Sequence, residues 1–385
     1  MGLRKIDESK FRRITVDTGL NERIERESLN FWQEASVRLR KNPFAITGMV
    51  IIVLLIIFSL IGPYFNEYTY KQQIESPVTS WPLKEMRPRV PGLEKIGILD
   101  GTIKEKISKE LYNPDTKQLG EYKDGEYEII DENANLTFGE TKVPAYEVEI
   151  DQYKHNGIED KYFWFGTDSL GRDQWTRTWK GTRVSLLMGF ASAAVCMLIG
   201  IAYGSIAGYY GGRLDNVMMR FAEVVGGVPY LVIVTLLMLI FDPGIYSILL
   251  ALVLRSWIGM ARIVRSQILK LKNQEFILAA KTLGTSDLKI IFKHCYPNII
   301  GQVMIMLTFI IPGAIFSEAF LAFIGFGLPA PMASLGVLIT DGRKVFLTKP
   351  YLMIIPSIVI SILMLSLNIF ANGLRDALDP KMRNN

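Results

Sequence analysis

Residues that build metal centres and nucleophilic sites are scarce in this sequence. Its 385 residues include two cysteines and two histidines. Cys196 lies in an apolar run, and neither it nor Cys295 belongs to a disulfide framework or a zinc-binding pattern. His155 and His294 are far apart in the sequence and are not expected to share a site. We therefore expect no metal and no cofactor bound by this chain.

Motifs of nucleotide-binding and hydrolytic enzymes are also missing. The sequence has no glycine-rich loop ending in a lysine and a hydroxyl residue, which would cradle nucleotide phosphates. It has no nucleophile elbow and no paired-histidine zinc motif. Chemistry by carboxylates alone stays open, but no catalytic residue is assigned and we do not expect an enzyme.

Charge is absent from Phe44–Phe65, whereas residues 67–160 hold 20 acidic and 12 basic residues, a net charge of −8. The chain as a whole carries +5, so the remainder carries +13. Long uncharged apolar runs exclude a uniformly soluble or disordered protein. The basic residues of the remainder flank apolar runs, as expected beside membrane spans, so nucleic acid is not an expected partner.

Six segments are long and apolar enough, or nearly so, to cross a bilayer as helices, which requires about 20 residues each. They are Phe44–Phe65, Leu186–Ile206, Val217–Phe241, Ile245–Ala261, Ile299–Pro331 and Tyr351–Asn372. The fifth is longer than one span and predicts a helix followed by a buried surface segment. The sequence therefore predicts an all-α polytopic membrane protein.

Lysine and arginine are concentrated in the loop Arg262–Pro297 and just before the first span. With six spans, both segments and the C-terminus lie on one side, which the positive-inside rule makes the cytoplasm. The first run begins too late and is too long for a cleaved signal peptide. Four basic residues disagree, because they would lie outside: Arg172, Arg177, Lys180 and Arg183. Long loops are largely exempt from the rule, so we keep the topology.

Residues 67–160 separate the first two spans and are predicted to form a small β-rich extracytoplasmic insert. Glu121–Ile130 and Val143–Tyr153 alternate polar and apolar residues, as half-buried strands do. Asp124-Gly125 is a hairpin-turn signal. The insert is either a docking surface for an extracytoplasmic partner or a solvated acidic decoration.

Two carboxylates fall inside predicted spans, where charge is costly and usually functional. We take Glu318, the adjacent Ser317 and Glu223 as candidate gating or pathway residues. The alternative for Glu318 is a helix-packing hydrogen bond or a place at the outer membrane edge. The alternative for Glu223 is an ion pair with Arg220.

The basic loop predicts a helix–turn–helix elbow between two spans. A short helix starting at Glu275 should end at Gly284, which tolerates the left-handed conformation. Thr285-Ser286-Asp287 then offers N-cap oxygens for a second helix, Leu288–Cys295, stopped by Pro297. Phe276, Ile277 and Leu283 would give apolar contact. Periodicity alone favours the alternative, an ordinary amphipathic connector that lies on the lipid headgroups.

The order of residues in this elbow resembles the "EAA" loop of ATP-binding-cassette (ABC) importer permeases. It contains Ala279-Ala280, then Gly284, then His294-Cys295-Tyr296-Pro297, with Leu278 in place of the leading glutamate. Further stretches resemble the C-type subunit of oligopeptide and dipeptide permeases: Phe165–Asp173 with Gly181–Leu186, Pro312–Ala319 with Gly325–Leu328, and Asn372–Pro380. The resemblance covers Pro43–Phe65 and Phe163–Lys381. The insert is similar to the enlarged outer loop of some Gram-positive peptide permeases.

The resemblance implies the type I importer (MetI-like) permease fold in the cell membrane. It divides the chain into a cytoplasmic segment (1–43), a first span (44–66), the insert (67–160), a five-span core (161–373) with a coupling loop (263–297), and a cytoplasmic tail (374–385). The implied partners are a second permease, two ATPases that carry ATP and Mg, and an extracytoplasmic peptide-binding lipoprotein. The implied ATPase-coupling residues are Glu275, Leu278, Ala279, Ala280, Gly284, His294 and Pro297.

The implied function is oligopeptide import, with dipeptides, nickel or another small solute as alternatives. A secondary transporter would also have basic loops and intramembrane carboxylates, but should show internal repeats, and none is evident. A membrane-anchored sensor or adhesion protein would not require six spans or such an elbow.

Overall fold

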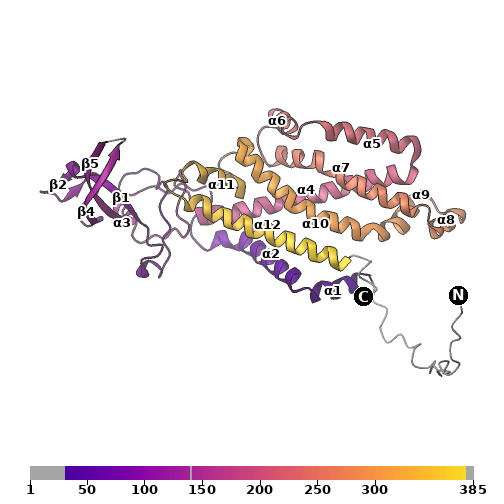
Figure 1. Ribbon diagram of the computed structural model, residues 1–385, viewed down its shortest axis with the longest axis horizontal. Coiled ribbons are helices and arrows are strands. Elements are labelled where there is room, and N and C mark those ends of the chain that lie inside the picture. Colours follow the sequence, from indigo (N-terminus) through magenta and orange to yellow (C-terminus); the bar gives the residue numbers. More distant parts are fainter. Residues whose placement is uncertain (1–30, 139–140, 379–385) are drawn as a thin grey trace, which may run out of the picture.

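The computed structural model describes residues 31–138 and 141–378, which form an elongated helical bundle with a small sheet unit at one end (Figure 1). Residues 1–30 of the predicted N-terminal segment and 379–385 of the predicted tail lie outside the described residues. The helices are α1 (Phe31–Lys41), α2 (Pro43–Ile61), α3 (Gln152–His155), α4 (Gln174–Tyr210), α5 (Gly212–Gly227), α6 (Tyr230–Phe241), α7 (Ile245–Leu271), α8 (Glu275–Thr282), α9 (Asp287–Lys289), α10 (Tyr296–Leu321), α11 (Leu335–Lys344) and α12 (Tyr351–Leu378). The strands are β1 (Thr102–Ser108), β2 (Tyr112–Asn113), β3 (Gln118–Leu119), β4 (Tyr127–Phe138) and β5 (Thr141–Asp151).

Among the described residues, five helical segments are long and apolar enough to cross a membrane, and a bent helix pair makes up to six. The five segments contain α2, α4, α7, α10 and α12, and the bent pair is α5 with α6. The predicted all-α polytopic fold with a small β-rich insert is confirmed. Several spans are longer than predicted, because α4 begins at Gln174 and α7 continues to Leu271.

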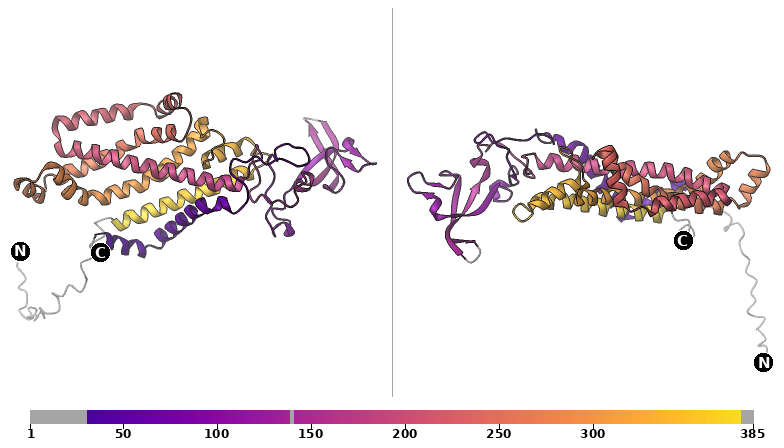
Figure 2. Two further views of the ribbon diagram at one scale, coloured as in Figure 1. Left: turned by 180° about the vertical axis from the view of Figure 1, so that it is seen from behind. Right: turned by 90° about the horizontal axis from the view of Figure 1, so that it is seen from above.

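Helix α2 begins at a well-formed cap. Asn42 accepts a hydrogen bond from the Ala45 N–H at 3.2 Å, and Pro43 occupies the first turn, where its missing N–H costs nothing. The helix runs beside α12 (Figure 2). A Cβ at Gly48 would lie 2.9 Å from the Ser366 carbonyl oxygen, so glycine is needed for this close approach. The first and last spans are therefore packed together.

Helix α4 is central, and its most extensive helix contact is with α7. The contact follows glycines at every fourth position, Gly200, Gly204 and Gly208. A Cβ at Gly204 would lie 2.4 Å from the Ala261 carbonyl oxygen. Small residues at such spacing let helix backbones approach closely within a membrane.

The third predicted span, Val217–Phe241, is not one continuous helix. Its two parts, α5 and α6, are bent by 82° relative to each other. Gly226 and Gly227 end α5, and the break that follows consists of Val228, which is extended with φ −69° and ψ 130°, and Pro229. Glycine weakens a helix, and a proline disfavours the helical conformation of the residue before it. Apolarity alone predicted continuity, and that prediction is wrong.

The fifth predicted span, Ile299–Pro331, ends as a helix at Phe326, after a π-helical turn over Ala322–Phe326. Gly325 has φ 98°, and the following segment turns back into the protein. Ala333 and Ser334 are buried there, which agrees with the predicted buried segment. Helix α11 follows and was not predicted.

The insert contains a three-stranded antiparallel sheet in the order β1-β5-β4. Strand β5 overlaps the predicted strand Val143–Tyr153, whereas β4 begins six residues later than the predicted Glu121–Ile130. Asp124-Gly125 does not join paired strands, because it turns the chain just before β4. β1 was missed, because the consecutive charged residues Lys104, Glu105 and Lys106, all exposed, leave no alternation of polar and apolar positions.

Candidate coupling and transport site

The predicted elbow lies between α7 and α10, at the end of the bundle opposite the sheet (Figure 1). Gly284 ends α8 in the left-handed conformation, with φ 77°. The Thr285 N–H donates to the Ala280 carbonyl oxygen at 3.1 Å, and the Leu283 N–H donates to the Ala279 carbonyl oxygen at 3.1 Å. These bonds satisfy carbonyls left free at the helix end. The predicted turn is confirmed.

The two faces of α8 differ. Phe276, Leu278 and Leu283 are exposed, and Leu283 most of all at 84%. Ile277 and Ala280 are instead buried against a cluster that includes residues of α7 and α10. The expectation that Ile277 offers outward contact is wrong, because the helical period turns it inward together with Ala280, one of the implied coupling residues. Glu275 and Ala279 are exposed.

The second half of the elbow differs from the prediction. Ser286 takes the N-cap position but makes no side-chain capping hydrogen bond. Pro297 does not stop the helix, because a π-helical turn over Ile290–Cys295 leads directly into α10, where Pro297 occupies the first turn. The missing proline N–H is harmless at a helix start. The Asn298 side-chain amide donates to the carbonyl oxygen of the half-buried His294 at 2.7 Å.

Two polar contacts, which the local sequence does not reveal, link this end of the bundle. The Tyr209 hydroxyl at the end of α4 donates to the Asp287 carboxylate at 2.7 Å. The Arg265 guanidinium on α7 binds both carboxylate oxygens of Asp215 on α5, with an Nη2–Oδ2 distance of 2.6 Å. The elbow is thus attached to α4, and α5 is attached to α7. Tyr209 and Asp215 were missed because their partners are distant in sequence.

The candidate gating residues are not brought together. Glu318 on α10 is fully buried and accepts a hydrogen bond from the Ser185 hydroxyl of α4 at 3.1 Å. Ser185 also accepts one from the Leu335 N–H at the start of α11, at 3.2 Å. Ser317 donates to the Gly313 carbonyl oxygen of its own helix. These contacts fit the packing alternative for Glu318.

Glu223 lies elsewhere, on α5. It pairs with Arg220 at 3.0 Å, and both side chains are largely exposed. This is the pair that the alternative reading expected. A surface pair of this kind contributes little stability.

A buried ionic cluster forms at the start of α4. Asp168 pairs with Arg172 at 2.7 Å and with Arg177 at 3.1 Å, and Arg177 is 1% exposed. Arg183 donates to the carbonyl oxygens of Ser59 and Leu60 at the end of α2. These arginines satisfy internal acceptors, which explains how basic residues are tolerated at the end predicted to lie outside.

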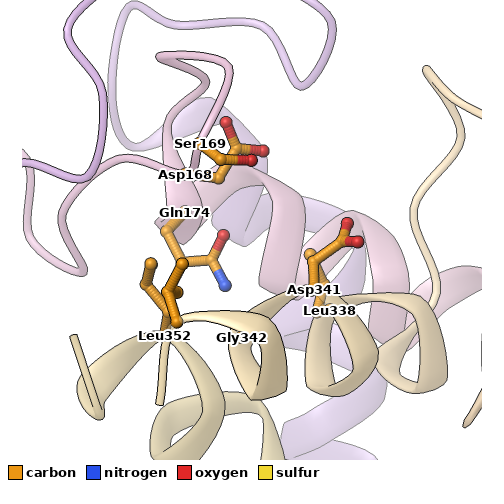
Figure 3. Close-up of a pocket in the computed structure, with 8 residues that line it drawn as sticks. Asp168, Ser169, Gln174, Leu338, Asp341, Gly342 and Leu352 are labelled. Atoms are coloured by element: carbon orange, nitrogen blue, oxygen red, sulfur yellow. The ribbon is translucent and has the colours of Figure 1, made fainter. Parts of the chain in front are cut away.

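The pocket beside this cluster is too small for a substrate. Asp168, Gln174 and Asp341, drawn in Figure 3, are among the residues that line it. Its volume is about 10 Å³, enough for about one water molecule. At the adjacent cap of α4, burial raises the pKa of Asp173 although Thr176 and Asn66 donate hydrogen bonds to its carboxyl group. The region ties the insert to the bundle and does not form a binding cavity.

Residues 200–384 match the family described as "Binding-protein-dependent transport system inner membrane component", and residues 30–79 match the "N-terminal TM domain of oligopeptide transport permease C". The chain is 35% identical to the oligopeptide transport system permease protein OppC of Bacillus subtilis, over 99% of this chain and 100% of that protein. It is 36% identical to the dipeptide transport system permease protein DppC of Lactococcus lactis, over 94% of this chain and 93% of that protein. Among solved structures, the inward-facing methionine transporter MetNI matches with a TM-score of 0.40 and 15% identity, over 51% of this chain and 94% of that chain.

Proposed function

This chain belongs to the inner membrane components of binding-protein-dependent ABC importers, in the C-type branch of oligopeptide and dipeptide permeases, and we propose that it forms half of a translocation pathway for oligopeptides. The similarity to an oligopeptide permease over the full length of that relative supports the substrate class.

The proposed assembly pairs this chain with a second, homologous permease. Two cytoplasmic ATPase subunits would bind ATP and Mg and carry out the hydrolysis, so that this chain performs no bond chemistry itself. An extracytoplasmic lipoprotein would deliver the peptide. The N-terminus, the elbow and the C-terminus would face the cytoplasm, and the insert would face outward.

The observation that carries the coupling proposal is the exposed face of α8. Phe276, Leu278 and Leu283 project from a short helix between two spans, where apolar side chains are costly to leave in water. A groove on an ATPase would cover them. When the ATPases close, the attached α7 and α10 would move and change access to the pathway, which is a rigid-body switch between two states.

Reconstitution tests the proposal directly. The four membrane and ATPase subunits are placed in liposomes with the binding protein, and uptake of labelled oligopeptides, dipeptides and nickel is measured with and without ATP. ATP-dependent oligopeptide uptake is expected. Uptake of dipeptides or nickel alone would contradict the oligopeptide assignment, and uptake without ATP would contradict the importer mechanism.

A further inference from the structure

An open cavity of about 410 Å³ lies between the second half of α5 and the middle of α7. Its polar lining consists of Glu223, Arg255 and Arg262, and three glycines, Gly226, Gly227 and Gly259, line it as well. The volume is in the range of small-ligand sites. Glycines leave the backbone accessible to a ligand. The cavity is therefore large enough for the end of a peptide and carries charge.

Both arginines are on α7, where Arg255 lies inside the predicted span Ile245–Ala261 and Arg262 directly follows its last residue. Arg255 is about 15 Å and Arg262 about 26 Å from the start of α7, at 1.5 Å per residue in a helix of about 40 Å. Arginine is costly in hydrocarbon and is normally found there facing a protein interior or a water-filled path. This face of α7 is therefore not expected to face lipid.

Within the described part of the chain, neither Arg255 nor Arg262 has an ion-pair partner. The carboxylate in the cavity, Glu223, is already engaged by Arg220 at 3.0 Å. The Tyr230 hydroxyl is close enough to Arg255 for the two groups to interact electrostatically. It is buried without a hydrogen-bond partner among the described residues. The cavity thus presents unneutralised positive charge and unused hydrogen-bond donors.

We propose that this cavity binds the C-terminal carboxylate of a peptide in transit, through Arg255 and Arg262. The planar guanidinium group matches a carboxylate with two parallel hydrogen bonds. Every linear peptide with a free C-terminus carries that group whatever its sequence, so recognition of it would accept many sequences. The inference rests on the proposed peptide import.

The test compares a tetrapeptide bearing a free C-terminal carboxylate with its C-terminal amide. Uptake of each is measured in liposomes with the complete importer and with binding protein saturated by that peptide. Removing hydrogen bonds to a charged group should cost about tenfold. The wild type is expected to carry the acid about ten times faster than the amide.

In the double variant Arg255→Gln, Arg262→Gln, the ratio should fall to about one through slower uptake of the acid, while the amide rate is unchanged. The control is Arg213→Gln, an exposed arginine at the start of α5 that does not line the cavity. If the glutamine variant does not assemble, Arg255→Lys with Arg262→Lys keeps the charge and should lower the ratio partially.

A ratio that both sets of variants leave unchanged would overturn the proposal. The proposal would also be overturned if the variants assembled poorly but their assembled complexes kept the wild-type ratio of acid to amide uptake. The arginines would then contact the second permease and not the peptide. If the wild type carries neither peptide, the proposed function fails. If it carries both at equal rates, only the carboxylate site fails.

Discussion

Gly284 is the residue at which backbone conformation matters most for coupling. Its φ of 77° is left-handed, and a Cβ there would meet nothing within 4 Å. Glycine is therefore favoured here by the backbone conformation and not by lack of space. A residue with a side chain would destabilise this left-handed conformation by about 1–2 kcal/mol. We predict that Gly284→Val leaves membrane insertion intact but separates ATP hydrolysis from peptide uptake.

The control for this change is Gly284→Asn, because asparagine tolerates the left-handed conformation better than a β-branched residue. Hydrolysis and uptake are measured together in liposomes. The asparagine variant should keep most uptake and the valine variant should lose it. Normal uptake by Gly284→Val would contradict the coupling assignment.

Glu126 in the insert supports a second prediction at this scale. Burial alone would raise its pKa, but hydrogen bonds with His155 at 2.8 Å and from the Lys123 N–H at 3.0 Å outweigh it and lower the pKa. A lowered folded-state pKa means that the stabilisation is complete above the ordinary carboxyl pKa of 4.5 and is lost as the pH falls through the folded value.

We expect Glu126→Gln to lower the free energy of unfolding by about 1 kcal/mol at pH 7. The substitution should have no effect at low pH, where the wild-type carboxyl is protonated and therefore uncharged like the amide. Thermal unfolding of the full chain from pH 7 to pH 3 measures the difference, with Glu132→Gln, an exposed position, as control. A difference that is already lost above pH 4.5 would contradict the assigned pKa direction.

At the scale of elements, the contact between Tyr209 and Asp287 attaches the elbow to α4. A hydrogen bond to a carboxylate contributes about 1.5–3 kcal/mol. Tyr209→Phe deletes the hydroxyl alone, and we expect peptide uptake to fall several-fold while ATP hydrolysis changes little. Tyr210→Phe is the matched control, because Tyr210 is adjacent and exposed. Equal uptake by the two variants would contradict a role for this contact.

The same elements show what the sequence predicts and what it does not. The turn at Gly284 was predictable because its cause is local. The bend at Pro229 also has a local cause in Gly-Gly-Val-Pro, but the apolar run across it predicted one continuous span. The helix through Pro297 depends on the π-helical turn before it, and the contacts of Glu318 and Asp287 depend on residues far away in the chain. Spans and turns are encoded locally, whereas tertiary contacts are not.

At the scale of the whole molecule, the insert has two parts with different neighbours. Its first part is built into the bundle, since the Thr167 hydroxyl contacts the Leu83 carbonyl oxygen and accepts a hydrogen bond from the Met86 N–H. The sheet projects beyond this part (Figure 2). Removing residues 76–158 would therefore expose the Asp168 cluster as well as remove the sheet, so loss of uptake would not identify a docking surface.

A narrower replacement separates the two parts. Thr102 pairs with Asp151 at the base of the sheet, so residues 102–150 can be replaced by a short Gly-Ser linker without stretching the chain. If the acidic sheet captures the binding protein, uptake at limiting binding protein should fall several-fold and should approach the wild-type rate at saturation, because charge acts mainly on encounter. In the wild type, added salt should reduce the uptake rate at limiting binding protein in the same way, and uptake by the sheetless variant should not depend on salt.

Equal uptake by the two proteins at limiting binding protein would show that the sheet is a solvated surface loop with no docking role. A loss of uptake that persists at saturating binding protein would instead place the sheet in the transport cycle itself.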